Sequence, residues 1–169
     1  DGLRQGCRLT LMSAPAGYGK TTLLSEWVAH SDQLERVAWV SLDESDNDPA
    51  RFWAYVAAAL QAADEDISGI DPPPFRSGDA TAIDSVLIGL LNQITAVPER
   101  MVLVLDDYHV IRSPAIHAAL SFMLENLPPQ MHLVLATRVD PPLPIPRLRG
   151  RGQLTGLFQA DLRFTPDEA

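Results

Sequence analysis

A short segment near the start of the chain combines glycines, a lysine and hydroxyl side chains in the run Gly17-Tyr18-Gly19-Lys20-Thr21-Thr22. Gly17 and Gly19 allow a sharp backbone turn that brings successive N–H groups toward one point, which suits an anion. The lysine that follows can reach the β- and γ-phosphates of a nucleotide, and the Thr21 hydroxyl can ligate Mg²⁺. The pattern predicts a phosphate-binding loop, or Walker A motif.

The residues on either side of this loop support the prediction. An apolar run from Leu9 to Met12 predicts a strand before it, and apolar residues at helical spacing predict a helix over 20–30. The free amides and the dipole at the start of that helix favour a bound phosphate. Ala14 stands where the pattern usually has its first glycine, and we expect its methyl group to be tolerated at negative φ. An ordinary glycine-rich turn is the alternative that this context disfavours.

A second candidate segment lies far downstream, where five apolar residues from Met101 to Leu105 precede Asp106 and Asp107. Such a run predicts a strand buried on both faces, as in parallel sheets. The acids fall at its carboxyl end, where open α/β sheets place their ligands. Asp106 is therefore the predicted Mg²⁺ partner, as in a Walker B motif, and Asp107 is a candidate for polarising the attacking water.

Composition narrows the possible classes of protein. A chain of 169 residues, 46% of them hydrophobic, suits one folded domain. The net charge of −9 opposes broad contact with nucleic acid, because phosphate groups would be repelled. We find no apolar stretch long enough for a membrane span and no secretory leader. The single cysteine, Cys7, permits no internal disulfide, so we expect a cytoplasmic protein.

Signals for strands and helices alternate along the chain, which predicts an α/β fold with a parallel sheet covered by helices on both faces. Asp48-Pro49 and Ser113-Pro114 each resemble a helix cap followed by proline, and Thr81 with Asp84 resembles a capping box. Further strands are expected at 37–42 and 132–136, and residues 63–78 are expected to form a loop.

Several other polar residues were weighed as site candidates. Arg138 follows the predicted fourth strand and is a candidate sensor of the γ-phosphate, the alternative being an ordinary surface ion pair. His109 follows the acidic pair closely, but a role outside the site is the commoner explanation. The acidic stretch from Asp43 to Asp48 is better explained by capping and turns than by calcium. The basic run from Arg147 to Arg151 is left open between a contact with phosphate, a domain or a subunit and a solvated face.

Five segments, taken together and in order, resemble the ATPase module of the MalT-like, LuxR-family large ATP-binding transcriptional regulators, which belong to the STAND class of signalling NTPases. They are Ala14 to Leu24 (APAGYGKTTLL), Trp39 to Pro49 (WVSLDESDNDP), Val102 to Ile111 (VLVLDDYHVI), Leu133 to Pro142 (LVLATRVDPP) and Leu148 to Thr165 (LRGRGQLTGLFQADLRFT). The resemblance implies a three-layer P-loop NTPase fold whose five parallel strands have the order 5-1-4-3-2.

The resemblance also implies roles for individual residues. The nucleotide, ATP or ADP, would be held by Ala16, Gly17, Tyr18, Gly19, Lys20, Thr21 and Thr22. Thr21 and Asp106 would serve Mg²⁺, while Lys20, Asp107 and Arg138 would be catalytic, with Asp107 orienting water and Arg138 sensing the γ-phosphate.

Relatives of this kind act as switches. ADP accompanies a resting form, whereas ATP with an inducer favours a self-associating form that activates transcription. We therefore expect residues 1–160 to form the nucleotide-binding domain, and residues 161–169, with Asp161 to Phe164 as the hinge, to begin a helical or winged-helix domain. DNA would be bound only through a C-terminal domain outside this sequence, and no membrane contact is expected.

Two alternatives stay open. A small-molecule kinase shares the phosphate loop and the parallel sheet, although the arginine cluster lies next to the expected hinge and not in an obvious lid. A module that binds nucleotide without hydrolysing it would serve only in interaction.

Overall fold

Twelve helical and extended elements follow one another along the chain in the computed structural model, which describes residues 6–30, 36–67 and 80–158. The strands are β1 (Leu9–Ser13), β2 (Arg36–Ser41), β3 (Met101–Asp106), β4 (Met131–Thr137) and β5 (Leu154–Phe158). The α-helices are α1 (Lys20–His30), α2 (Pro49–Ala63), α3 (Ala80–Ala96), α4 (Pro114–Glu125) and α5 (Ile145–Gly150). Two 3₁₀ turns, η1 (Glu44–Asn47) and η2 (Tyr108–Val110), complete the set.

The strands form one sheet of five in the order β2-β3-β4-β1-β5, with every pair parallel. Read from the other edge, this is the expected order 5-1-4-3-2, which is thereby confirmed. The register places Ser13 opposite Thr137 and Ser41 opposite Asp106. The carboxyl ends of these strands therefore lie along one edge of the sheet.

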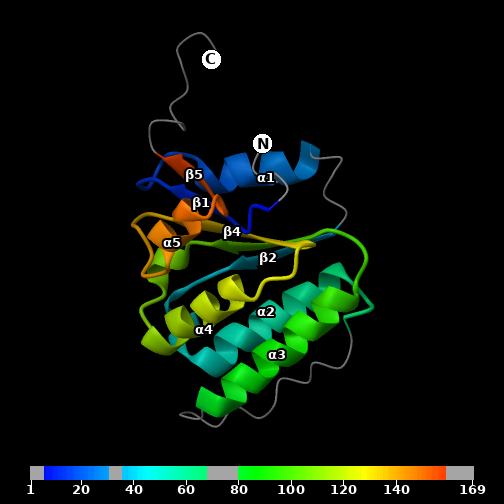
Figure 1. Ribbon diagram of the computed structural model, residues 1–169. Helices are drawn as coiled ribbons and strands as arrows, with labels where there is room; N and C mark the ends of the chain where they lie inside the picture. Colours follow the sequence, from blue (N-terminus) through cyan, green and yellow to red (C-terminus); the bar gives the residue numbers. More distant parts are fainter. Residues whose placement is uncertain (1–5, 31–35, 68–79, 159–169) are drawn as a thin grey trace.

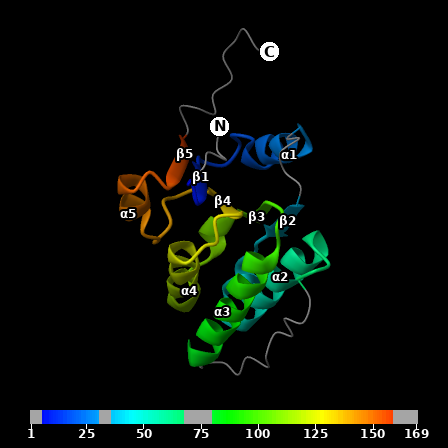
Figure 2. The same ribbon diagram turned by 45° about the vertical axis from the view of Figure 1, so that its right-hand side comes forward.

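Helices cover both faces of the sheet, as expected (Figures 1 and 2). Helix α1 lies on one face, and α2, α3 and α4 lie together on the other. Alternate residues of β3 serve the two sides, because successive side chains of a strand point in opposite directions. Leu103 and Leu105 join the larger apolar core, whereas Val102 and Val104 join the smaller core beneath α1.

The helix caps agree with the sequence in one case and differ in another. The Asp48 carboxylate accepts hydrogen bonds from the backbone N–H groups of Ala50 (2.8 Å) and Arg51 (3.1 Å), so Asp48 caps α2 as predicted. The prediction that Thr81 caps α3 was wrong. Helix α3 already begins at Ala80, which places Thr81 inside its first turn.

Only part of the apolar surface of α1 is buried. Leu24 is buried, but Leu23 is 37% exposed, because α1 packs against the sheet with one side only and has no second helix beside it in the described residues (Figure 1).

Among the described residues, no helix has both the length and the apolar character that crossing a membrane requires. The expected hinge and the helix start after it lie outside the described residues.

His132 on β4 gives the fold a testable dependence on pH. Its side chain is buried, Nε2 lies 2.8 Å from the Thr10 hydroxyl, and Nδ1 lies 3.1 Å from the Cys7 carbonyl oxygen. Burial lowers the pKa of His132, although the hydrogen bond with Cys7 opposes the shift. The unfolded chain, with an ordinary histidine pKa of about 6.5, therefore takes up a proton before the folded chain does.

We expect the free energy of unfolding to decrease as pH falls below about 6.5, by at most about 1.4 kcal/mol per pH unit from this residue. Urea denaturation between pH 7.5 and 5 should give a shallower slope for His132→Gln than for the natural protein. Thr10→Val, which keeps the imidazole, should retain the steeper slope. Equal slopes for His132→Gln and the natural protein would contradict this role.

Candidate functional site

The glycine loop, the two aspartates and Arg138 gather at the carboxyl edge of the sheet. The loop leaves β1, the aspartates end β3, and Arg138 follows β4 directly. β4 pairs with both β1 and β3, so the three strand ends are neighbours. The fold therefore brings together residues that are far apart in the sequence.

The loop has the backbone conformation that its glycines predict. Gly17 and Gly19 have φ values of 85° and 67°, in the left-handed region that disfavours other residues. Ala14 is buried and is not among the positive-φ residues, so its methyl group is accommodated as expected. The Leu23 N–H donates to the Gly19 carbonyl at 2.9 Å, so α1 starts at the end of the loop.

Lys20, the only lysine in the chain, reaches back across this loop. Its ammonium group donates to the carbonyl oxygens of Ala14 (2.6 Å) and Pro15 (3.0 Å), and the residue is only 7% exposed. Burial lowers the pKa of Lys20, and the positive charge of Arg138 lowers it further, against the opposing effects of Asp107 and Asp106. Neutral carbonyls are weaker partners for an ammonium than phosphate oxygens are, so a phosphate can take their place.

A hydrogen bond joins the loop to the acidic strand end. The Thr21 hydroxyl donates to Asp106 Oδ2 at 2.9 Å, and the backbone N–H of Asp107 donates to Asp106 Oδ1 at 2.9 Å. Asp106 is buried, so both of its carboxylate oxygens are held in place.

This pair fits the needs of Mg²⁺ in nucleotide sites. That ion takes one or two protein oxygens and completes its shell with phosphates and water. Among the described residues, no three histidine, cysteine or acidic side chains gather to hold a metal by themselves. Thr21 and Asp106 would therefore hold Mg²⁺ together with phosphate oxygens, and the ion would neutralise part of the phosphate charge.

Asp107 has an unusual backbone. Its φ of 59° and ψ of 37° are left-handed, and it is the single non-glycine residue with positive φ in the described chain. Aspartate tolerates this conformation better than most residues, but holding it still depends on the surrounding structure. The side chain is 45% exposed at the edge of the sheet, where a water molecule can reach it.

Arg138 and His109 complete the group. Arg138 is exposed, and its positive charge lowers the pKa of both Lys20 and His109. Burial is the largest cause of the lowered pKa of His109, and Asp107 and Asp106 oppose it. His109 Nδ1 lies 3.8 Å from Asp107 Oδ1. The sequence interpretation had favoured a position outside the site for this histidine.

Asn47 was missed in the sequence, although it fastens the loop after β3. Its side-chain nitrogen donates to the carbonyls of Glu44 and Val110, each at 3.0 Å. Its side-chain oxygen accepts from the N–H groups of Arg112 (2.6 Å) and Ser113 (3.2 Å). Nothing in the sequence around Asn47, which lies among acidic capping residues, indicates that its partner is more than sixty residues away.

The acidic residues around Asn47 act as caps, as the sequence predicted. The Asp43 carboxylate accepts from the Ser45 N–H at 2.7 Å, and Asp46 Oδ2 accepts from the Asp43 N–H at 2.9 Å. Asp46 also pairs with Arg51 at 3.0 Å. These carboxylates therefore hold η1 and the start of α2.

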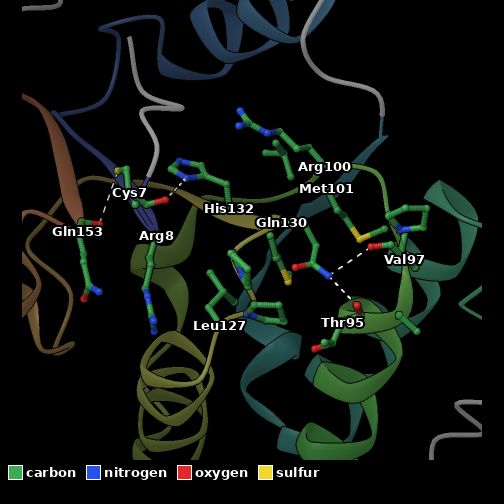
Figure 3. A pocket seen from close by; sticks show the side chains of 17 residues that line it. Cys7, Arg8, Thr95, Val97, Arg100, Met101, Leu127, Gln130, His132 and Gln153 are labelled. Carbon is green, nitrogen blue, oxygen red and sulfur yellow. Dashed lines mark hydrogen bonds between the residues drawn. The ribbon is translucent and has the colours of Figure 1, made fainter.

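A cavity of about 620 Å³ lies at the opposite edge of the sheet, beside the amino ends of β3 and β4 (Figure 3). Several of its polar side chains are already hydrogen-bonded within the fold. The Gln130 amide donates to the carbonyls of Ile94, Thr95 and Val97 at 2.9–3.2 Å and so closes the end of α3. His132 Nδ1 is hydrogen-bonded to the backbone carbonyl oxygen of Cys7, as the dashed line shows. This cavity is separate from the phosphate loop.

Removing the Asn47 side chain tests its role as a fastener. Asn47→Ala leaves the Arg112 N–H and the Val110 carbonyl without their partners, and we expect a loss of about 1–3 kcal/mol in the free energy of unfolding. Urea denaturation measures the loss. Asn126→Ala, which removes one exposed hydrogen bond to Phe122, is the matched control. A loss for Asn47→Ala no larger than that of the control would show that the fastening is unimportant.

Comparisons with known proteins place the chain among its relatives. It is 40% identical over 162 residues to the HTH-type transcriptional regulators MalT of Cronobacter sakazakii and Serratia proteamaculans, and 39% identical to that of Klebsiella pneumoniae. Each match covers 96% of this chain and 18% of the regulator, so the chain spans less than a fifth of these proteins. No family model matches the chain.

Among solved structures, the chain is similar in fold to Cdc6p from Pyrobaculum aerophilum. The TM-score is 0.54 at 21% identity, covering 92% of this chain and 41% of that one. A chain in the structure of Drosophila ORC bound to AT-rich DNA and Cdc6 gives a TM-score of 0.53 at 17% identity, covering 99% and 56%. These likenesses concern the fold alone. The chain has a P-loop NTPase fold, and by sequence it is homologous to a segment of the MalT HTH-type transcriptional regulators.

Proposed function

We propose that this chain is the ATP-binding, slowly ATP-hydrolysing module of a MalT-like transcriptional regulator. The observation that carries the proposal is the hydrogen bond from Thr21 to Asp106, with the Lys20 ammonium held over the adjacent loop. Those three groups supply the hydroxyl, the carboxylate and the cation that a Mg²⁺-bound triphosphate requires.

The proposal gives a role to the glycine loop, to the two aspartates and to Arg138. The backbone N–H groups from Ala16 to Thr22 and the Lys20 ammonium bind the phosphates. Thr21 and Asp106 hold Mg²⁺, Asp107 orients the attacking water, and Arg138 contacts the γ-phosphate. Phosphoryl transfer depends above all on positioning and charge stabilisation, and these residues include the types of group that supply both.

The nucleotide would act as a switch in the whole regulator. Arg138 would distinguish ATP from ADP, and movement through a hinge at 161–164, the boundary between a domain at 1–160 and the segment at 161–169, would pass that difference on. ATP would favour self-association of the full-length protein in the cytoplasm. DNA would be bound through a domain beyond this segment, which fits a match to only 18% of the regulators' length.

The two alternatives predict different products. Free phosphate released from ATP and Mg²⁺ alone supports the ATPase, whereas phosphate transfer that requires an added acceptor supports a small-molecule kinase. Bound ATP that stays intact supports an interaction module without hydrolysis.

Lys20→Ala tests nucleotide binding. Loss of the ammonium removes the main charge partner of the β- and γ-phosphates, and we expect ATP affinity in the presence of Mg²⁺ to fall about 100-fold. Isothermal titration calorimetry measures the affinity, and circular dichroism checks that the fold is retained. Arg100→Ala, which removes an exposed positive charge at the opposite edge, is the control and should bind normally. Unchanged affinity in Lys20→Ala would refute the assigned site.

Arg138→Ala tests recognition of the γ-phosphate. We expect ATP affinity to fall about 10-fold, the effect of one charge-assisted contact, while ADP affinity changes less than about 2-fold. Titrations of both nucleotides into the variant, the natural protein and Arg100→Ala give the comparison. An equal loss for ATP and ADP would mean that Arg138 does not report the γ-phosphate.

A further inference from the structure

The side chain of His109 has a buried ring nitrogen that forms no hydrogen bond within the described residues. Nδ1 of its ring is shielded from solvent and has no hydrogen-bond partner among the described residues. Leaving such an atom unpaired is unfavourable, and buried polar side chains nearly always have a partner. An unpaired nitrogen beside a ligand site therefore indicates a bond that forms when the ligand is present.

The surroundings of this nitrogen limit what that bond can be. Its nearest charged oxygen is Asp107 Oδ1 at 3.8 Å, which is too far for a hydrogen bond. A small side-chain rotation would bring the two atoms within hydrogen-bond distance. Arg138 and Lys20 are also near enough for their charges to act on the ring. The histidine therefore lies among the residues that the proposed function assigns to the γ-phosphate and to the water.

The two neighbours of His109 are each held by a hydrogen bond that does not involve its ring. The Tyr108 hydroxyl bonds to His117 Nδ1 at 2.8 Å, and the Val110 carbonyl accepts from Asn47 at 3.0 Å. Tyr108 is fully buried as well. The imidazole is consequently not needed to hold this turn in place, and its position beside Asp107 is set by its neighbours.

The ring is suited to donate one hydrogen bond. Burial and the charge of Arg138 lower the pKa of His109, so the imidazole is neutral near pH 7 and the 3.8 Å contact is not an ion pair. A neutral imidazole carries one N–H, and a carboxylate beside Nδ1 favours the tautomer with the proton on that nitrogen.

We propose that His109 is a positioning residue for ATP hydrolysis, whose Nδ1–H donates to the Asp107 carboxylate once the triphosphate is bound. This inference rests on the proposed function. The bond would fix one Asp107 oxygen and leave the other to accept from the attacking water. The water oxygen then bonds to the γ-phosphorus as the bond from phosphorus to the ADP oxygen breaks. A water proton passes to Asp107 and from there to solvent, while His109 keeps its own proton.

Single-turnover hydrolysis in three variants tests the proposal. His109→Leu should bind ATP within about 2-fold of the natural protein but hydrolyse it about 10- to 100-fold more slowly, the range for a misplaced catalytic group. His109→Asn, whose amide nitrogen reaches about the place of Nδ1, should stay within about 3-fold of the natural rate. In an Asp107→Asn background, His109→Leu should cause no further loss, because His109 acts through Asp107.

His117→Leu is the matched control for packing. It removes a histidine of α4 that is hydrogen-bonded to Tyr108, the neighbour of His109, and so frees the Tyr108 hydroxyl without changing Asp107. We expect its hydrolysis to stay within about 3-fold of the natural rate. A loss as large as that of His109→Leu would assign the effect to packing of the turn and overturn the proposal.

Imidazole ¹⁵N NMR gives a second readout that does not require turnover. Adding aluminium fluoride to the protein with ADP and Mg²⁺ should shift the His109 Nδ1 signal, whereas ADP and Mg²⁺ alone should not, and Asp107→Asn should abolish the shift. No shift, or natural hydrolysis by His109→Leu in a protein that binds ATP, overturns this inference alone. Absence of ATP binding by the natural protein overturns the proposed function and this inference with it.

Discussion

The hydrogen bond between the Thr21 hydroxyl and Asp106 depends on almost everything else in the structure. It joins residues 85 positions apart at a distance of 2.9 Å. It requires that β1 and β3 end at the same edge of the sheet, which follows from parallel pairing of both strands with β4. It also requires that α1 begin where the loop ends, because Thr21 lies in its first turn. The order of the strands thus serves to place one hydroxyl beside one carboxylate.

The polar side chains at the two edges of the sheet differ in how they are hydrogen-bonded. At the carboxyl edge, polar groups keep unused hydrogen-bonding capacity: the Lys20 ammonium is bonded only to neutral carbonyls, and His109 has an unpaired nitrogen. At the amino edge, Gln130 and Arg8 use their side-chain donors to close helix ends. Gln130 ends α3, and Arg8 donates to the last carbonyls of α4, those of Leu124 (3.0 Å) and Glu125 (2.7 Å). This contrast is the physical reason for assigning the ligand to the first edge in spite of the large cavity at the second.

Much of the fold could be predicted from the sequence, because its strands are apolar runs and its longer helices have clear periodicity. The glycines, Asp106 and Asp107 could be found from spacing alone, and the strand order followed from the resemblance to a known family. Other features left no local signal. Helix α5 has only six residues, among them one proline and two arginines, and β5 is interrupted by Gly156, so neither has an apolar pattern. Asn47 and the surroundings of His109 depend on contacts between distant segments, which spacing along the chain cannot predict.

The central claim is that a triphosphate displaces the loop carbonyls from Lys20, and the chain allows a direct measurement of this because it has a single lysine. The rate at which an acetylating reagent modifies Lys20, followed by peptide mass spectrometry, reports access to that amine. With Mg²⁺ and ATP at about ten times its Kd, we predict that modification slows about tenfold. AMP, which lacks the β- and γ-phosphates, should give no protection. Equal rates of modification with and without ATP would contradict the account.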